Sequence, residues 1–574
     1  MATQFRDTAC GQLIRLLSRK KLLRYPDEVD PALWKIFTHQ QSSTEELVGS
    51  SDDVAVEAAP PAQRGGDDPE KNADYGRRSS AQVKTDEASH DPLKGTLSSQ
   101  RADDGQDFYI VDWYGPGDPE NPLNWSEGWK FLIAAEVCIL NFSVYVASSL
   151  YVPGEESLQK EFGVSTVVAT LGLSLFSVGY GFGPMLWSPL SEFPSIGRSP
   201  IYLYTLLAFV LLQLPTGFAV NIAMFLVFRT LSGFVGSPIL ATGGATIGDT
   251  YGPARAAYGI CIWATFGVFG PVFGPLIGGF IAPVKGWRWT IWVFTFLNAF
   301  GVIMIFFLMP ETNPANILYR RARRLREATG EHKLRSQSEI DMAHHTIRDS
   351  LALLGRAFTL TFTEPIVFLV DLYTALLYGV LFIWFESFPL VFGGIYGFSI
   401  QSQGLVFLGI FVGGLITVPF YLLWVGRVLL PSVGKPTFRP EHVLPPTWAG
   451  ALSLPVCLFF YGWTARASIH WIVPIIGSSF FTVALVTFFN GILNYLGMSY
   501  PAYTASVFAG NGLFRALFGA VFPLFARALF SSLGIGPGNS LLGGIAVLFL
   551  PINFLMYFHG AKLRGVSKNA KHDD

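Results

Sequence analysis

A series of long apolar runs is the strongest constraint on how this 574-residue chain can fold. Stretches of roughly 20 mostly apolar residues follow one another from residue 129 onward, separated by polar or Gly/Pro-containing breaks. A helix of that length spans the hydrocarbon core of a bilayer, where the backbone must satisfy its own hydrogen bonds. We therefore predict an all-α membrane protein with twelve transmembrane helices. The predicted spans are 129–152, 167–190, 200–218, 223–247, 256–282, 289–309, 363–392, 403–425, 446–465, 470–496, 500–531 and 541–559.

The composition agrees with this class and excludes several functions. Hydrophobic residues make up 51% of the chain and charged residues only 14%, against about 25% charged in soluble proteins. No GxxxxGK[ST] phosphate-binding loop occurs, so we expect an ion gradient rather than ATP to supply energy. The spans carry no paired His or carboxylate ligands at helical spacing, so we expect no enzyme, metal or cofactor.

The distribution of Lys and Arg predicts the orientation of the chain. One long polar loop, 311–362, separates a half with six spans (129–310) from a second such half (363–560), which is followed by a short tail, 561–574. Its basic residues are Arg320, Arg321, Arg323, Arg324, Arg326, Lys333, Arg335, Arg348 and Arg356. Basic loops stay on the cytosolic side, so we expect this loop and both termini in the cytosol, with the chain in the plasma membrane.

The first 128 residues differ from the rest in composition. Residues 41–107 are rich in Ser, Asp, Glu and Gly and poor in aromatic residues, so we predict a largely disordered cytosolic tail over 1–128. Residues 13–23 carry leucines among basic side chains. They fit either a short amphipathic helix on an anionic leaflet or a solvated tail.

Six short sequence motifs lie in or next to the predicted spans. They are DPENPLNW (118–125), GPMLWSPLSEFPSIGRSPIY (183–202), FRTLSGF (228–234), FGVFGPVFGPLIGG (266–279), WRW (287–289) and PET (310–312). Together they resemble the major facilitator superfamily, in particular the fungal drug:proton antiporters with twelve spans. The resemblance covers residues 107–565 and implies two six-helix pseudo-repeats.

The resemblance also implies a function. We expect proton-coupled efflux, by antiport and alternating access, of hydrophobic or cationic small molecules such as antifungals, xenobiotics or a self-made toxic metabolite. A proton-coupled uptake symporter or a polyamine transporter on the same fold is the alternative, because a fold does not set direction. We expect a small-molecule substrate, protons and the lipid bilayer as partners, no nucleic acid, and a monomer.

Two of the motifs imply structural roles. The resemblance predicts a cytosolic latch between the second and third spans, although Ser199 stands where relatives carry a second basic residue. The predicted latch residues are Gly183, Pro189, Glu192, Gly197 and Arg198. In the fifth span, the antiporter motif of the family corresponds to Gly267, Gly270, Pro271, Gly274, Pro275, Gly278 and Gly279. Glycines at every fourth position give a smooth face for close helix packing, which the family places between the halves, and each proline removes one helix hydrogen bond.

Charged residues inside the spans mark candidate functional sites, because each costs about 2.5–3.5 kcal/mol on insertion scales. The span residues of this kind are Glu136, Arg229, Asp371, Glu386 and Arg515. Arg229 matches the family position that is linked to proton coupling; a structural ion pair is its alternative. We predict proton coupling by Arg229, Glu386 and Asp371, although snorkelling to water is the favoured explanation for both Asp371 and Glu136.

A pocket for an amphipathic cation is predicted from aromatic and polar side chains on several spans. Its predicted residues are Asn141, Tyr145, Tyr378, Phe382, Phe385, Glu386, Asn490, Asn494 and Arg515. Hydrogen bonding between helices is the alternative role for the asparagines, as is anchoring for Arg515 and an interhelical bond for Glu386.

Overall fold

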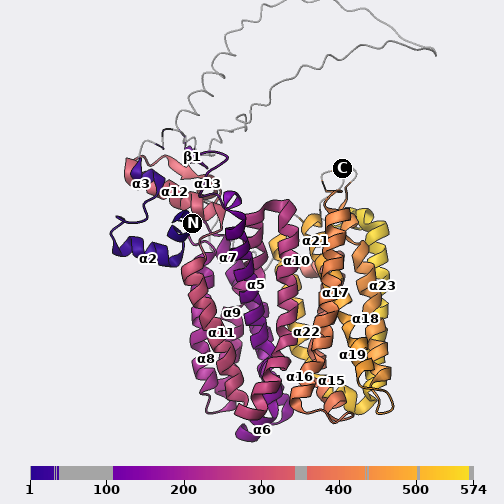
Figure 1. The fold of residues 1–574 in the computed structure, drawn as a ribbon. Coiled ribbons are helices and arrows are strands. Elements are labelled where there is room, and N and C mark those ends of the chain that lie inside the picture. The colour runs from indigo at the N-terminus through magenta and orange to yellow at the C-terminus, as the bar shows by residue number, and fades with distance from the viewer. Residues whose placement is uncertain are drawn as a thin grey trace, which may run out of the picture.

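The computed structural model describes residues 2–30, 108–342, 359–433, 438–500 and 504–567, together with positions 33, 35, 37, 435 and 570. Long helices run side by side through the bundle, with α1 (Ala2–Arg6) and the end of α23 (Ile535–Val566) at the same end (Figure 1). We call this the proximal end. The opposite, distal end carries α6 (Glu155–Phe162) and α16 (Ile400–Val406).

The first half contains helices at the first six predicted spans. They are α5 (Glu127–Ser149), α7 (Thr166–Glu192), α8 (Ser199–Gly217), α9 (Ile222–Gly236), α10 (Pro238–Lys285) and α11 (Trp287–Leu308). The predicted break between the fourth and fifth spans falls inside α10, where Gly252 adopts a φ of +71°. Only glycine takes such an angle readily, so the chain turns at this residue and α10 contributes to both spans. A short turn, η3 (Val152–Gly154), links α5 to α6.

The second half is more segmented. Its helices are α15 (Pro365–Phe388), α16, α17 (Leu408–Trp424), α18 (Pro445–Thr464), α19 (Ile472–Ser479), α20 (Phe481–Val483), α21 (Phe489–Ser499), α22 (Thr504–Leu533) and α23. Short π-helical stretches, η4 (Pro389–Gly393), η5 (Val425–Leu429) and η7 (Ala484–Phe488), and a 3₁₀ turn, η6 (Pro440–Val443), connect or extend them.

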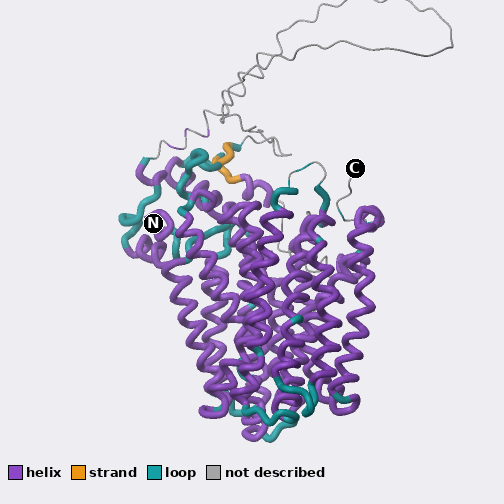
Figure 2. Tube along the Cα trace, turned by 45° about the vertical axis from the view of Figure 1, so that its right-hand side comes forward, coloured by secondary structure: helices purple, strands orange, loops and turns teal. Residues whose placement is uncertain are grey.

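Every predicted span therefore contains helix, and the all-α prediction is confirmed (Figure 2). Among the described residues, eleven helical segments are long and apolar enough to cross a membrane. The helix at the remaining predicted span is α18, which has 20 residues and packs against α19 and α23.

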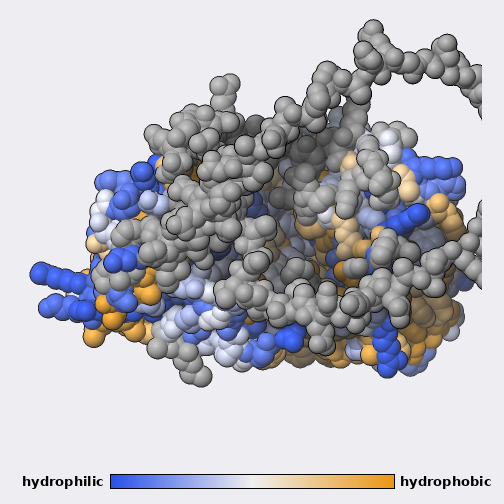
Figure 3. All heavy atoms as spheres, turned by 90° about the horizontal axis from the view of Figure 1, so that it is seen from above, coloured by the Kyte–Doolittle hydropathy of each residue, from blue (hydrophilic) through white to orange (hydrophobic). Residues whose placement is uncertain are grey.

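Large apolar side chains cover the flanks of the bundle. Phe296 on α11, Phe420 on α17 and Leu548 on α23 are 63%, 70% and 75% exposed. Seen from the proximal end, apolar surface follows the lower right flank (Figure 3). In a soluble protein such a belt would drive aggregation, whereas here it matches the hydrocarbon of a bilayer.

At the proximal end, three segments distant in sequence fold together into a unit that we call the proximal cap (Figure 1). It comprises α1, α2 (Ala9–Leu17), α3 (Pro26–Val29), β1 (Tyr109–Val111), η2 (Pro122–Asn124), α12 (Pro314–Thr329), β2 (Leu334–Ser336) and α13 (Gln337–Met342). β1 and β2 pair in parallel, with Tyr109 opposite Leu334. The prediction of a largely disordered tail is therefore wrong for residues 2–30 and 108–126.

Residues 41–107 of the predicted tail lie outside the described residues, as do residues 343–358 of the predicted basic central loop. The predicted amphipathic helix is shorter than expected, since α2 ends at Leu17 and the basic residues after it form turns. Whether this segment touches a leaflet stays a prediction.

Buried ion pairs hold the proximal cap together. Arg321 contacts Asp118 at 2.7 Å and Glu120 at 3.0 Å, and Arg6 reaches Glu120 at 3.0 Å from the chain's first helix. The guanidinium of Arg324 lies 3.5 Å from the centre of the Tyr25 ring. Burial alone would raise the pKa of the Asp118 carboxyl, but the Arg321 guanidinium beside it holds that pKa below its ordinary value.

We expect Arg321→Ala to release residues 108–126 from α12. The substitution leaves Asp118 buried without its cation, a change that costs about 3 kcal/mol or more in comparable buried pairs. Hydrogen exchange measured on peptides from 108–126 should accelerate strongly. In the wild type, acidification through the lowered pKa of Asp118 should have the same effect, because its charge stabilises the cap only above that pKa.

Arg323→Ala is the matched control on the same helix, since Arg323 is 66% exposed and pairs with Glu327 at the surface. Exchange in this variant should equal the wild type. Equal acceleration in both variants would show that the buried pairs do not hold the cap.

Candidate functional site

A small central cavity of about 30 Å³ lies between the two halves of the bundle. Of the predicted pocket residues, the structure brings Asn141, Tyr145, Tyr378 and Arg515 together here. The other lining residues are Leu240, Trp263, Ala264, Gly267, Val268, Thr374, Leu377, Leu485 and Phe489. Both halves contribute, so any change in their relative position alters this cavity.

The charge in the central cavity differs from the prediction. The guanidinium of Arg515 lies 4.5 Å from the centre of the Phe489 ring and 5.4 Å from that of Tyr378. Its Nε is buried and has no hydrogen-bond partner among the described residues. No carboxylate lines this cavity. The pocket is aromatic as expected, but its charged side chain is an arginine rather than Glu386.

Three predicted pocket residues line neither this cavity nor the second one described below. The Phe382 ring packs against that of Tyr378, with centres 5.1 Å apart. The side-chain amides of Asn490 and Asn494 donate to carbonyls of their own helical segment, at 2.9 and 2.8 Å. A pocket role for Phe382, Asn490 and Asn494 therefore stays a prediction.

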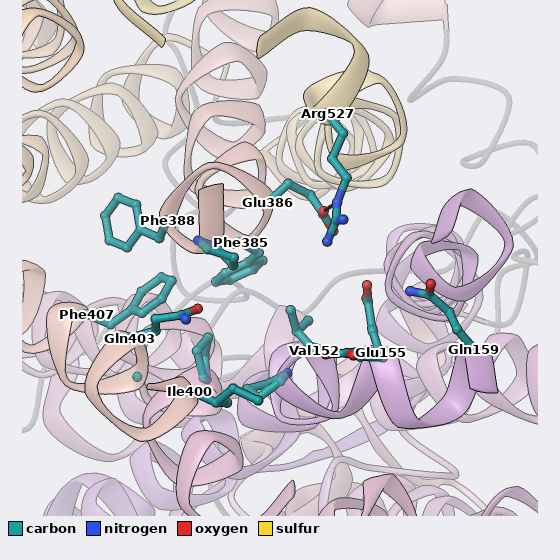
Figure 4. Close-up of a pocket in the computed structure, with 15 residues that line it drawn as sticks. Val152, Glu155, Gln159, Phe385, Glu386, Phe388, Ile400, Gln403, Phe407 and Arg527 are labelled. Carbon is teal, nitrogen blue, oxygen red and sulfur yellow. Dashed lines mark hydrogen bonds and ion pairs between the residues drawn. The ribbon is translucent and has the colours of Figure 1, made fainter. Parts of the chain in front are cut away.

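A second cavity of about 300 Å³, which we call the distal vestibule, opens between the halves at the distal end. Arg527 of α22 forms an ion pair with Glu386 of α15 (Figure 4). Phe385, Phe388 and Phe407 line the C-terminal side of the vestibule. Its remaining lining residues are Val152, Pro153, Glu155, Glu156, Gln159, Pro275, Pro389, Ile400, Gln403 and Gly404.

One carboxylate of the distal vestibule was missed by the sequence analysis. Glu155, the first residue of α6, is only 4% exposed. The Thr170 hydroxyl lies 3.4 Å from an oxygen of Glu155 and 3.4 Å from an oxygen of Glu386. The sequence analysis placed Glu155 just beyond the first span and Arg527 at the end of the eleventh, so neither was recognised as a buried charge.

Arg229 is fully buried and makes three hydrogen bonds, all to backbone carbonyls. It donates to Ala147 at 2.9 Å, Ser148 at 3.0 Å and Gly172 at 3.2 Å. Its guanidinium also lies over the Phe176 ring, 4.4 Å from the centre. Among the described residues it has no ion pair, so the alternative of a structural ion pair is not observed.

The remaining buried carboxylates do not snorkel. Glu136 and Asp371 are both 0% exposed, which contradicts that explanation for each. Asp371 accepts hydrogen bonds from Asn511 at 2.9 Å and Thr361 at 3.3 Å. Neither oxygen of Glu136 has a partner among the described residues. Side-chain amides and hydroxyls of neighbouring helices replace water for Asp371.

The glycine face of α10 packs within the first half rather than between the halves. A methyl group added at Gly274 would overlap the Ser149 side chain of α5, and one at Gly278 would overlap the carbonyl oxygen of Leu150. The Ser149 hydroxyl donates to the carbonyl of Pro271 at 2.9 Å. Pro275 lacks the N–H that would bond that carbonyl in a regular helix, so Ser149 supplies the missing donor.

Other residues of the same run do meet the second half. The position of a Cβ on Gly279 would lie 3.0 Å from the carbonyl oxygen of Ile400, and one on Gly404 would lie 2.6 Å from that of Pro275. The family-based expectation is therefore correct for Pro275 and Gly279. It is wrong for the face formed by Gly270, Gly274 and Gly278.

Two residues that were not predicted, Glu311 and Asp249, hold the latch together. Gly197 has a φ of +82°, and the Glu311 carboxylate accepts from the backbone N–H of Arg198 at 3.0 Å. Arg198 forms an ion pair with Asp249 at 2.9 Å. The other predicted members, Gly183, Pro189 and Glu192, belong to α7, where Gly183 packs against Ser237. These contacts all lie within the first half.

The sequence was compared with known protein families and curated proteins. A family model described as the Major Facilitator Superfamily matches residues 137–562. The chain belongs to the Major Facilitator Superfamily. A "Cycloheximide resistance protein" from Candida maltosa is 36% identical over 99% of this chain and 100% of that protein. "Fluconazole resistance protein 1" from Saccharomyces cerevisiae is 39% identical over 80% of this chain and 84% of that protein.

Solved structures of this superfamily share the fold. The proton:xylose symporter XylE aligns with a TM-score of 0.54 at 15% identity, covering 75% of this chain and 96% of that chain. At that identity the likeness concerns the fold alone. It confirms the predicted major facilitator fold for this member of the superfamily.

We expect Gly278→Ala to destabilise this major facilitator protein, because the added methyl overlaps the backbone of Leu150 on α5. Overpacking of this kind typically costs about 1–3 kcal/mol. The measurement is the midpoint of thermal unfolding in detergent, followed by size-exclusion chromatography. Gly248→Ala on the same helix is the control, since a Cβ there meets no atom within 4 Å. If both variants unfold at the wild-type temperature, the packing of α10 on α5 tolerates side chains.

Proposed function

We propose that this protein exports hydrophobic or cationic small molecules in exchange for protons, by alternating access of its two halves. The observation that carries the proposal is an aromatic cavity between two six-helix halves of a major facilitator fold. Two relatives that align with most of this chain are named for resistance to cycloheximide and fluconazole, which supports drugs as substrates. The proposed substrates are antifungals, xenobiotics or a toxic metabolite of the organism itself.

Contacts between the halves on both sides of the central cavity support alternating access. Distally, Gly404 approaches the backbone at Pro275; proximally, Gly426 approaches the Tyr258 hydroxyl. Trp263 and Gly267 of α10 line the cavity at positions between these two contacts. Alternating access would require each of these contacts to separate in turn, so that the cavity opens to one side at a time.

The proton is the coupling ion that the residues favour. One proton moving down 100 mV supplies about 2.3 kcal/mol, and each pH unit adds about 1.4 kcal/mol. The buried groups available to carry or sense it are Arg229, Asp371 and Glu386 as predicted, joined by Glu155. Buried carboxylates of this kind mark proton pathways in membrane proteins.

The proposed setting is the plasma membrane, with both termini in the cytosol. The basic α12 belongs to the proximal cap at the same end as α1 and the end of α23 (Figure 1). Basic loops favour the cytosolic side. The distal vestibule then opens to the outside.

Proton flux in vesicles tests this function. The purified transporter is reconstituted, a pH gradient is imposed, and cycloheximide or fluconazole is added. Proton movement opposite to the drug supports antiport. Movement of both in the same direction would make the protein an uptake symporter, and flux that ignores both drugs would remove them as substrates.

We expect Arg229→Ala to reach the membrane but to lower drug-driven proton flux at least tenfold, because the fixed charge beside α5 is lost. Arg229→Lys keeps the charge but cannot donate to all three carbonyls in a fork, so it separates charge from hydrogen bonding. Flux and thermal stability are measured together. Normal flux in the alanine variant would exclude Arg229 from coupling.

A further inference from the structure

Helix α2 of the proximal cap turns its apolar side chains outward and its polar ones inward. Leu13, Leu16 and Leu17 share one side of the helix and are 45%, 74% and 76% exposed. Arg15, which lies between them in sequence, points inward and is only 5% exposed. A helix on the surface of a soluble protein has the reverse arrangement. The outward leucines therefore need an apolar partner.

Polar contacts inside the cap hold this outward face in place. Arg15 pairs with the Glu28 carboxylate at 2.6 Å, and its guanidinium lies 4.4 Å from the centre of the Tyr25 ring. It also donates to the carbonyl of Leu23. The side-chain amide of Gln12 donates to the Tyr25 hydroxyl at 3.0 Å. Helix α2 and the turn that follows it are thus fixed to each other.

That turn displays basic side chains next to the leucines. Arg19, Lys21 and Arg24 are exposed, and none of the three has an ion pair among the described residues. Their neighbour Lys20 pairs with Glu327 at 3.2 Å. The surface formed by α2 and residues 18–24, which we call the basic foot of the cap, therefore combines exposed leucines with three unpaired positive charges.

The backbone of this turn is strained. Arg19, Lys20 and Leu23 have φ angles of +50°, +60° and +53°, and they are the only non-glycine residues in the left-handed region among those that the structure describes. A side chain disfavours this region, because its Cβ crowds the backbone. Such strain persists where surrounding contacts maintain it, and it is concentrated at functional segments.

The basic foot lies at the proximal boundary of the apolar flank. Helix α2 packs against α11, and its N-cap residue Thr8 pairs with Pro310, just after the end of α11. Ile303 and Phe307, in the last turns of α11, are exposed parts of that flank. Figure 1 shows α2 at the side of the bundle beside its proximal end. The outward leucines therefore lie at the level where the headgroups of the surrounding leaflet begin.

We propose that the basic foot binds anionic phospholipids of the leaflet that surrounds the proximal end. The leucines enter the boundary between headgroups and acyl chains, and Arg19, Lys21 and Arg24 contact the anionic headgroups. Anionic lipids are enriched in the cytosolic leaflet, which matches the proposed orientation. The surface lies on the cap, away from both cavities, so the proposal goes beyond efflux and does not rest on it.

Hydrogen exchange of the full-length protein in lipid nanodiscs tests the binding. One set of nanodiscs contains phosphatidylcholine alone, and the other contains phosphatidylserine in addition. We expect peptides from 9–24 to exchange at least about fivefold more slowly with phosphatidylserine, since each basic residue near an anionic leaflet strengthens binding by about that factor. High salt should reduce the difference. Equal exchange of 9–24 in both lipids would overturn the proposal.

Two lysine substitutions on the same cap distinguish the basic foot from a general effect of charge. Lys21→Gln removes one cation from the foot and should reduce the phosphatidylserine-dependent slowing about fivefold. Lys333→Gln removes the same charge from an exposed position directly before β2 and should leave the slowing unchanged. No loss in Lys21→Gln, or an equal loss in both variants, would contradict the assignment.

A double substitution tests whether the apolar face enters the leaflet. Leu16→Gln combined with Leu17→Gln keeps every charge and a similar helix propensity. Exchange of 9–24 should accelerate in both kinds of nanodisc, because insertion of leucine does not depend on lipid charge. Unchanged exchange in 108–126 verifies that the cap stays folded. Wild-type exchange of 9–24 in this variant would show that the leucines stay outside the leaflet and would reject their proposed role.

Discussion

Inside a bilayer, a polar group that loses its protein partner has no water to replace it, and this constraint organises the first half. Helix α5 ends at Ser149, so its last carbonyls lack helical donors. Arg229 of α9 donates to two of them and to Gly172 of α7. One guanidinium thereby joins three helices, and its positive charge lies at the helix end that favours a cation.

A second polar contact extends this unit to α10. The proline at 275 frees the carbonyl of Pro271, and the Ser149 hydroxyl of α5 bonds it. The glycine face of α10 lets the backbones approach closely enough for that bond. The glycines and prolines therefore act together: prolines remove hydrogen bonds inside α10, and the adjacent helix replaces one of them. These contacts tie α5, α7, α9 and α10 into one packed unit.

Contacts between the halves are of another kind. They include the close approach of Gly404 to Pro275, the packing of Gly181 on Ala516, and the bond from the Ser174 hydroxyl to the Ala520 carbonyl at 2.6 Å. Small side chains and single hydrogen bonds lose little when they separate, compared with a guanidinium bonded to three carbonyls. This distribution of contacts favours separation between the halves over separation of helices within the first half.

The helices were predictable from sequence because each needs only an apolar run of sufficient length. The cap was not, because composition predicts disorder for residues 2–30 and 108–126, while Arg321 and Arg6 find their carboxylates far away in the chain. The site was predicted in part. The positions of Asn141 and Tyr378 along their spans were enough to predict that they line the central cavity. Position along a span does not show which of two cavities a side chain faces. Glu386 was therefore assigned to the central cavity, whereas it lines the distal vestibule.

The two cavities differ in charge, and this difference affects the direction in which a cation moves. Arg515 makes the central cavity positive, whereas Glu155 and Glu386 share a single arginine at the distal vestibule. A cation in the central cavity is repelled by Arg515 and attracted by the vestibule once the distal contact opens. With the distal end outside, this gradient favours release outward.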